Sequence, residues 1–123
     1  MMTIDDLLCD LQKANPDATV YFDFCNCFPT IIESWRGVYA EPALGWKSLE
    51  YSKRRQAPTV SALIAELRHA KDGRPFTGWK GGEFRFEGSD TLHIDNAGEC
   101  TNTELVRVEN DDWRVFLHTR REG

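Results

Sequence analysis

The sequence has no hydrophobic segment long enough to cross a membrane. A transmembrane helix needs roughly 20 consecutive apolar residues, and every apolar run in this chain is much shorter. The N-terminal segment is acidic and amphipathic, whereas a secretory signal has a basic start and then a continuous apolar stretch. We therefore expect no membrane association and no secretion, and we expect the protein to reside in the cytoplasm.

Cysteine and histidine are too few and too poorly spaced for a recognisable metal site. The chain has four cysteines and three histidines. One residue separates Cys25 from Cys27, whereas zinc knuckles place two residues between their cysteines. His69, His93 and His118 are not at helical ligand spacing from one another. We expect reduced thiols, no metal and no cofactor.

The sequence also lacks a recognisable catalytic constellation. No serine has the sequence context of a nucleophile elbow, and the phosphate-loop pattern is missing. Asp23 and Glu33 could face each other across paired strands, and His93 could join them in acid–base chemistry, but nothing locates a substrate. We predict that the protein is not an enzyme, and a small hydrolase or transferase that uses these three residues is the alternative.

Aromatic residues, in contrast, are plentiful: 4 Trp, 3 Tyr and 7 Phe in 123 residues. They supply enough apolar surface to exclude a disordered chain. A chain of this length has the size of one domain, and folding buries roughly two-thirds of its surface. We predict a single domain over residues 1–123 with an ordered core at about residues 3–119.

Hydrophobic periodicity predicts two helices, at residues 4–14 and 60–71. Each places apolar side chains at positions i, i+3, i+4 and i+7. Thr3 and Asp6 fit a capping box at the start of the first helix, and Thr59 precedes the second. Both helices should bury one apolar stripe.

Alternation of apolar and polar residues predicts the strands. They are expected at residues 19–25, 30–36, 43–46, 83–86, 91–95, 104–109 and 113–119. Residues 83–86 and 91–95 should pair as one hairpin, and residues 104–109 and 113–119 as another. The order of elements predicts an α+β fold, with two helices packed on a mostly antiparallel sheet.

Charge is unevenly distributed along the chain. The net charge is −5, which disfavours direct nucleic-acid binding. Residues 47–80 carry eight basic and three acidic side chains, whereas residues 83–112 carry nine acidic and two basic ones. Either the two stretches pair with each other across the fold, or they form separate surfaces for an anionic ligand and a basic partner.

The first candidate binding segment is rich in glycine and contains Trp79, Lys80, Gly81 and Gly82. Glycine lets a ligand approach the backbone closely, lysine adds a positive charge, and tryptophan adds a stacking face. These groups suit a nucleotide or a phosphate. The alternative is a bulged connection between helix and sheet, with Trp79 packed.

The second candidate segment places an arginine between two aromatic residues, Trp35, Arg36 and Tyr39. Arginine has the side chain best shaped for a bidentate grip on a phosphate or carboxylate. The alternative is an arginine that pairs internally with one of the many acidic residues.

Three segments together resemble a family of small bacteriophage-encoded proteins whose activity is not assigned. Residues 34–39 read Ser-Trp-Arg-Gly-Val-Tyr, residues 59–64 read Thr-Val-Ser-Ala-Leu-Ile, and residues 76–84 read Phe-Thr-Gly-Trp-Lys-Gly-Gly-Glu-Phe. The resemblance spans about residues 3–119 and implies a phage or prophage origin. The basic segment 47–58 and the Cys-Asn-Cys insertion at 25–27 depart from the family.

These observations favour a binding function in the cytoplasm of an infected bacterium. We expect a non-enzymatic phage protein that counters host defence by stoichiometric binding to a host nuclease or a CRISPR-type complex. Its acidic region, including Asp111 and Asp112, would mimic nucleic acid and occupy a basic groove. The alternatives are sequestration of a nucleotide immune messenger and a regulatory role through homo-oligomers.

Overall fold

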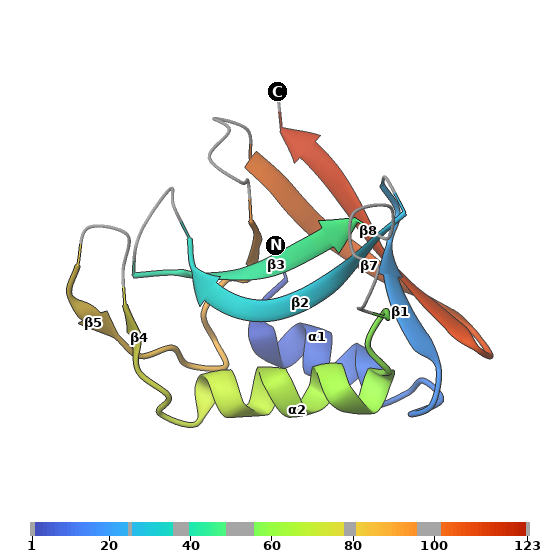
Figure 1. The fold of residues 1–123 in the computed structure, drawn as a ribbon, viewed down its shortest axis with the longest axis horizontal. Coiled ribbons are helices and arrows are strands. Elements are labelled where there is room, and N and C mark those ends of the chain that lie inside the picture. Colours follow the sequence, from blue (N-terminus) through green and yellow to red (C-terminus); the bar gives the residue numbers. More distant parts are fainter. Residues whose placement is uncertain are drawn as a thin grey trace.

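Two helices lie against one face of a six-stranded β-sheet, and two short strands form a separate hairpin beside it (Figure 1). This computed structural model describes residues 2–24, 26–35, 40–48, 56–77, 81–95 and 102–122. The predicted α+β class is confirmed, because both helices cover a mostly antiparallel sheet within a single domain. Neither helix has the length and apolar content that crossing a membrane would require.

Helix α1 (Ile4–Leu11) begins with the predicted capping box. The Thr3 hydroxyl accepts the N–H of Asp6 at 3.1 Å, and the Asp6 carboxylate accepts the N–H of Thr3 at 3.0 Å. The helix ends before residue 14, because the N–H groups of Lys13 and Ala14 bond to carbonyls three residues back and tighten the last turn. Its buried residues are Ile4, Leu7, Leu8 and Leu11.

Helix α2 (Val60–Lys71) has the bounds that the sequence predicts. The Thr59 hydroxyl caps it by accepting the N–H of Ala62 at 3.1 Å. Gly73 follows the helix with a φ of 89°, a left-handed conformation that favours glycine. The buried residues are Val60, Leu63, Leu67 and Ala70. Together with the buried residues of α1, these side chains form the helix side of the core.

The six-stranded sheet has the order β1-β8-β7-β6-β3-β2, so β1 and β2 form its two edges. In chain order the strands are β1 (Thr19–Phe22), β2 (Cys27–Ser34), β3 (Pro42–Ser48), β4 (Phe76–Thr77), β5 (Glu83–Phe84), β6 (His93–Ile94), β7 (Asn102–Asp111) and β8 (Arg114–Glu122). The pairs β1–β8 and β3–β6 are parallel, and the others are antiparallel. The predicted β7–β8 hairpin is confirmed.

The predicted hairpin between residues 83–86 and 91–95 is wrong. Strand β5 pairs with β4, and β6 lies between β3 and β7. The segment between β5 and β6 instead bonds to the start of α1: the carbonyl of Gly88 accepts the N–H of Asp5 at 2.9 Å, and the carbonyl of Asp90 accepts the N–H of Ile4 at 3.2 Å. These carbonyls of Gly88 and Asp90 are therefore bonded to the helix start, and the segment does not form the turn of the predicted hairpin.

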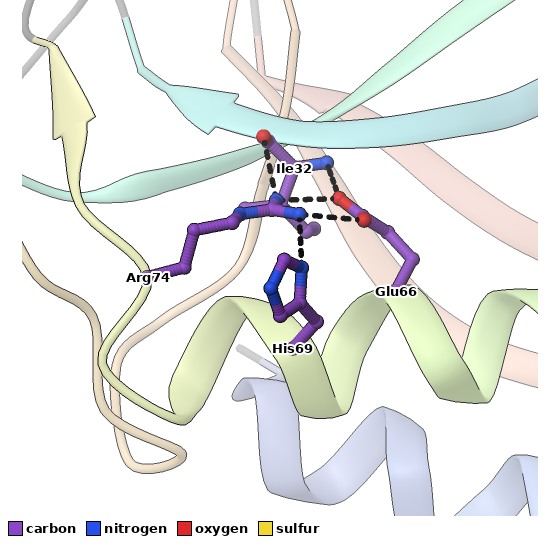
Figure 2. A network of polar contacts seen from close by, with 4 residues as sticks. All are labelled: Ile32, Glu66, His69 and Arg74. Atoms are coloured by element: carbon purple, nitrogen blue, oxygen red, sulfur yellow. Dashed lines mark hydrogen bonds and ion pairs between the residues drawn. The ribbon is translucent and has the colours of Figure 1, made fainter.

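The edge strand β2 is covered by an ion pair from α2 and the segment that follows it (Figure 2). A bulge lies between Pro29 and Ile32, and edge strands tolerate both proline and bulges. The Glu66 carboxylate accepts the N–H of Ile32 at 2.7 Å, and the Arg74 guanidinium donates to the carbonyl of Ile32 at 3.4 Å. This pair takes the place of a neighbouring strand at Ile32.

The ion pair itself is tightly held. Arg74 Nη1 and Nη2 lie 2.8 and 2.6 Å from the two carboxylate oxygens of Glu66, and the guanidinium stacks over the Phe76 ring at 4.5 Å. His69 Nδ1 lies 2.9 Å from Arg74 Nη1. Burial raises the pKa of Glu66, but the hydrogen bonds from Arg74 and from the Ile32 N–H outweigh it and lower the pKa below its ordinary value.

Candidate functional site

The β7–β8 turn presents two carboxylates and an exposed indole at the end of a hairpin. We call Asp111, Asp112 and Trp113 the hairpin tip. All three are exposed, and Trp113 is 70% accessible to solvent. Among the described residues, Ile31 and Val106 are the other exposed large hydrophobic side chains, and both are less accessible than Trp113. Exposed tryptophan is unusual on a small monomer and is the residue type most enriched among dominant interface contacts.

Hydrogen bonds from the α1–β1 connection hold the backbone of this turn. The N–H of Thr19 donates to the carbonyl of Trp113 at 3.1 Å, and the side-chain amide of Asn15 donates to the carbonyl of Asp112 at 3.2 Å. In the opposite direction, the side-chain amide of Asn110 donates to the carbonyl of Lys13 at 3.4 Å. The tip is therefore fixed through its main chain while its side chains stay exposed, which lowers the entropy cost of binding.

A pocket of about 490 Å³ opens beside the indole. We call it the tip pocket, and its lining residues are Lys13, Asn15, Asn110, Asp112 and Trp113. Asp112 forms no ion pair with another described residue, and Asp111 lies 4.0 Å from Arg114 in a pair exposed to solvent. Such exposed pairs contribute little. The tip therefore keeps an anionic character next to its aromatic face.

Trp35, a predicted binding residue, lies mostly inside the protein. Its side chain is 9% exposed and stacks on the ring of His93, with ring centroids 3.7 Å apart and planes 3° apart. His93 Nε2 lies 3.1 Å from a carboxylate oxygen of Glu41. Burial lowers the pKa of His93, and Glu41 opposes this shift. In this arrangement Trp35 packs the face of the sheet that is remote from the helices, so little of its ring can contact a partner.

Four of the other predicted binding residues, Arg36, Tyr39, Trp79 and Lys80, lie outside the described residues. Gly81 and Gly82 are described: both are exposed, and their φ angles are 84° and 85°. They directly precede β5, and their left-handed backbone conformation favours glycine. A ligand site in this segment stays a prediction, because most of the side chains that would form it are not described.

The basic and acidic stretches do not pair with each other within the described part of the chain. No ion pair between two described residues joins residues 47–80 to residues 83–112. Lys71 pairs with Asp5 at 2.7 Å, outside both stretches. Arg74 pairs with Glu66, a member of its own stretch, at 2.6 Å.

Asp23 and Glu33, two residues of the enzyme alternative, do not lie on paired strands. Asp23 follows β1 and Glu33 lies in β2, and these strands are opposite edges of the sheet, so the predicted pairing between them is wrong. Asp23 instead accepts hydrogen bonds from the N–H and hydroxyl of Thr119, at 2.9 and 2.7 Å. Burial, with the nearby Asp95 carboxylate, raises the pKa of Glu33, and Lys47 opposes the shift.

A second polar cluster surrounds His118, which sequence reasoning did not single out as a site. Its Nδ1 lies 3.6 Å from an Asp23 oxygen, and its Nε2 lies 3.2 Å from a Glu109 oxygen. Both ring nitrogens thus face carboxylates. Among the described residues no group of side chains converges in metal-ligand geometry.

Comparison with known proteins adds no family or fold relative. No family model, no curated protein and no solved structure matches this chain. The resemblance to small phage proteins therefore stays a prediction, and the geometry of the hairpin tip is the basis for assigning a function.

Proposed function

We propose that this protein acts by stoichiometric binding, without covalent chemistry, to a host protein that has a basic surface. The hairpin tip makes the contact. The observation that carries this proposal is the exposed indole of Trp113 beside Asp111 and Asp112, on a turn whose backbone is held by the α1–β1 connection. Interface energy concentrates in a few such residues, and opposite charge accelerates their encounter with a partner.

The class of partner follows from charge and from the resemblance to phage proteins. Nucleases and CRISPR-type complexes hold nucleic acid in basic grooves, and the carboxylates of the tip offer the same sign of charge as phosphates. An acidic protein that occupies such a groove competes with nucleic acid at a one-to-one ratio. The protein would therefore counter a host defence by obstruction.

The test is capture of a basic host effector from infected cells, followed by binding measurements with the purified pair. Trp113→Ala should weaken binding by at least about thirtyfold, the effect of removing a dominant interface residue. The double substitution Asp111→Asn, Asp112→Asn should also weaken binding. The affinity of this variant should fall less steeply with rising salt than that of the unmodified protein, since fewer charges remain to be screened.

A matched control separates a specific contact from overall charge. The double substitution Glu83→Gln, Glu87→Gln removes the same two negative charges in and just after β5, which lies at the opposite end of the molecule from the hairpin tip in Figure 1. Binding should change by less than about twofold. Equal losses from both double variants would show that net charge alone drives the association, and the tip would no longer be the proposed surface.

A further inference from the structure

We infer that the tip pocket receives an arginine side chain of the basic partner. This inference rests on the proposed function and specifies the chemical group that the tip recognises. The pocket combines the exposed indole of Trp113, the carboxylate of Asp112 and the side-chain carbonyl of Asn110. A guanidinium matches all three, because it is cationic, planar and rich in donors.

The hydrogen bonds around the pocket leave several acceptors available. Asn15 is engaged through both polar atoms of its side chain, since its Nδ2 donates to the carbonyl of Asp112 and its Oδ1 accepts the N–H of Asp17 at 3.0 Å. Asn110 donates through Nδ2 to the carbonyl of Lys13, and its Oδ1 has no partner among the described residues and can accept a hydrogen bond. Asp112 adds two carboxylate oxygens without an ion pair among the described residues. A ligand that donates hydrogen bonds therefore finds acceptors here, at Asn110 Oδ1 and at the Asp112 carboxylate.

The aromatic wall selects among cationic ligands. Arginine is the cation most often found over tryptophan, and its plane stacks on the indole while its edge reaches a carboxylate in a bidentate contact. Lysine brings one compact, strongly hydrated charge and no plane. The single basic residue of the lining, Lys13, lies 3.9 Å from Asp10 in an exposed pair. A phosphate would meet the negative charge of the Asp112 carboxylate.

The test uses the full-length ¹⁵N-labelled protein and three small probes: N-acetyl-argininamide, N-acetyl-lysinamide and the uncharged N-acetyl-citrullinamide. At low salt, the arginine probe should shift the indole N–H of Trp113 and the side-chain amide of Asn110, with half-saturation in the millimolar range. Half-saturation by the lysine probe should require at least about threefold more ligand. The citrulline probe should not saturate.

Two variants locate the site. Asp112→Asn should raise the half-saturation concentration of the arginine probe about tenfold, the effect of losing one charge-assisted contact, while Glu83→Gln should leave it unchanged. Trp113→Phe, which keeps an aromatic ring and serves as a check on folding, should weaken binding less than Trp113→Ala. Equal response to arginine and lysine, or shifts that map away from the tip, would overturn the inference.

The two levels of the proposal fail in different ways. If the arginine probe binds at the tip but no host protein is captured through it, the arginine pocket stands and the proposed function falls. If a host protein is captured through the tip but the arginine probe causes no shift there, the proposed function stands and the arginine pocket is wrong.

Discussion

Glu66 should stabilise the fold far more than an exposed carboxylate, because one side chain satisfies both Arg74 and the bulged edge strand. Its two oxygens accept from Arg74 at 2.8 and 2.6 Å and from the N–H of Ile32 at 2.7 Å. Glu66 and Arg74 are only 17% and 20% exposed. Surface pairs contribute at most about 1 kcal/mol and breaking a buried pair costs about 3–5 kcal/mol, so we place Glu66→Ala at about 2–3 kcal/mol.

The assay is urea unfolding at pH 7, with the free energy of unfolding taken from the linear extrapolation. Glu83→Ala is the control: its pair with Arg85 has about 60% exposure on both sides, so it should cost less than about 0.5 kcal/mol. The cost of Glu66→Gln should lie between those of Glu66→Ala and Glu83→Ala, because the amide oxygen still accepts the N–H of Ile32 but the side chain carries no charge to pair with Arg74. A cost for Glu66→Ala no larger than that of the control would refute the reasoning.

The same residue has a pH signature with a defined sign. Because the pKa of Glu66 is lowered in the folded state, its contribution is fully present above the ordinary value of 4.5 and is lost as pH falls through the lowered pKa. The stability gap between the unmodified protein and Glu66→Gln should therefore narrow below about pH 4.5. A gap that stays constant down to acid pH would contradict a charged carboxylate at this position.

Three other substitutions test the rest of the structure. Glu33→Gln should raise the melting temperature at pH 7, because the raised pKa of Glu33 makes its charge unfavourable there, and the effect should fade as pH falls below the ordinary value of 4.5, where Glu33 becomes protonated in both the folded and the unfolded state. Because burial lowers the pKa of His93, the unmodified protein should lose stability as pH falls below 6.5. His93→Phe should keep an aromatic ring against Trp35 and should not show this loss. Gly81→Ala, at a φ of 84°, should destabilise by about 1 kcal/mol in urea unfolding.

Local signals explain why both helices could be predicted from the sequence. Thr3 and Thr59 form their caps with residues three positions along the chain, and the apolar stripes are read from the same few turns. The β7–β8 hairpin is also local, because its strands are joined directly by the turn at Asp112 and Trp113. Short-range patterns are thus enough to place these elements.

Non-local pairing explains the errors. The position of β6 depends on Ala43, which pairs with His93 from 50 residues earlier in the chain, and on Glu104 of the next strand. No periodicity in residues 91–95 specifies those neighbours. Trp113 shows the same limit within the site. Alternation would place it on the core-facing side with Val115 and Leu117, but it belongs to the turn and stays exposed. Its exposure follows from the turn geometry and not from the alternation of the strand.

The construction of the hairpin tip separates stability from recognition. The hydrogen bonds that hold the turn involve main-chain carbonyls of Asp112 and Trp113 and side chains of the α1–β1 connection, whereas the indole and the carboxylates of the tip contribute little to the core. We therefore expect substitutions of the tip side chains to leave the fold intact and, under the proposed function, to alter binding to the partner. Substitution of Asn15 should do the reverse, because it leaves the chemistry of the tip intact and releases the backbone that presents it.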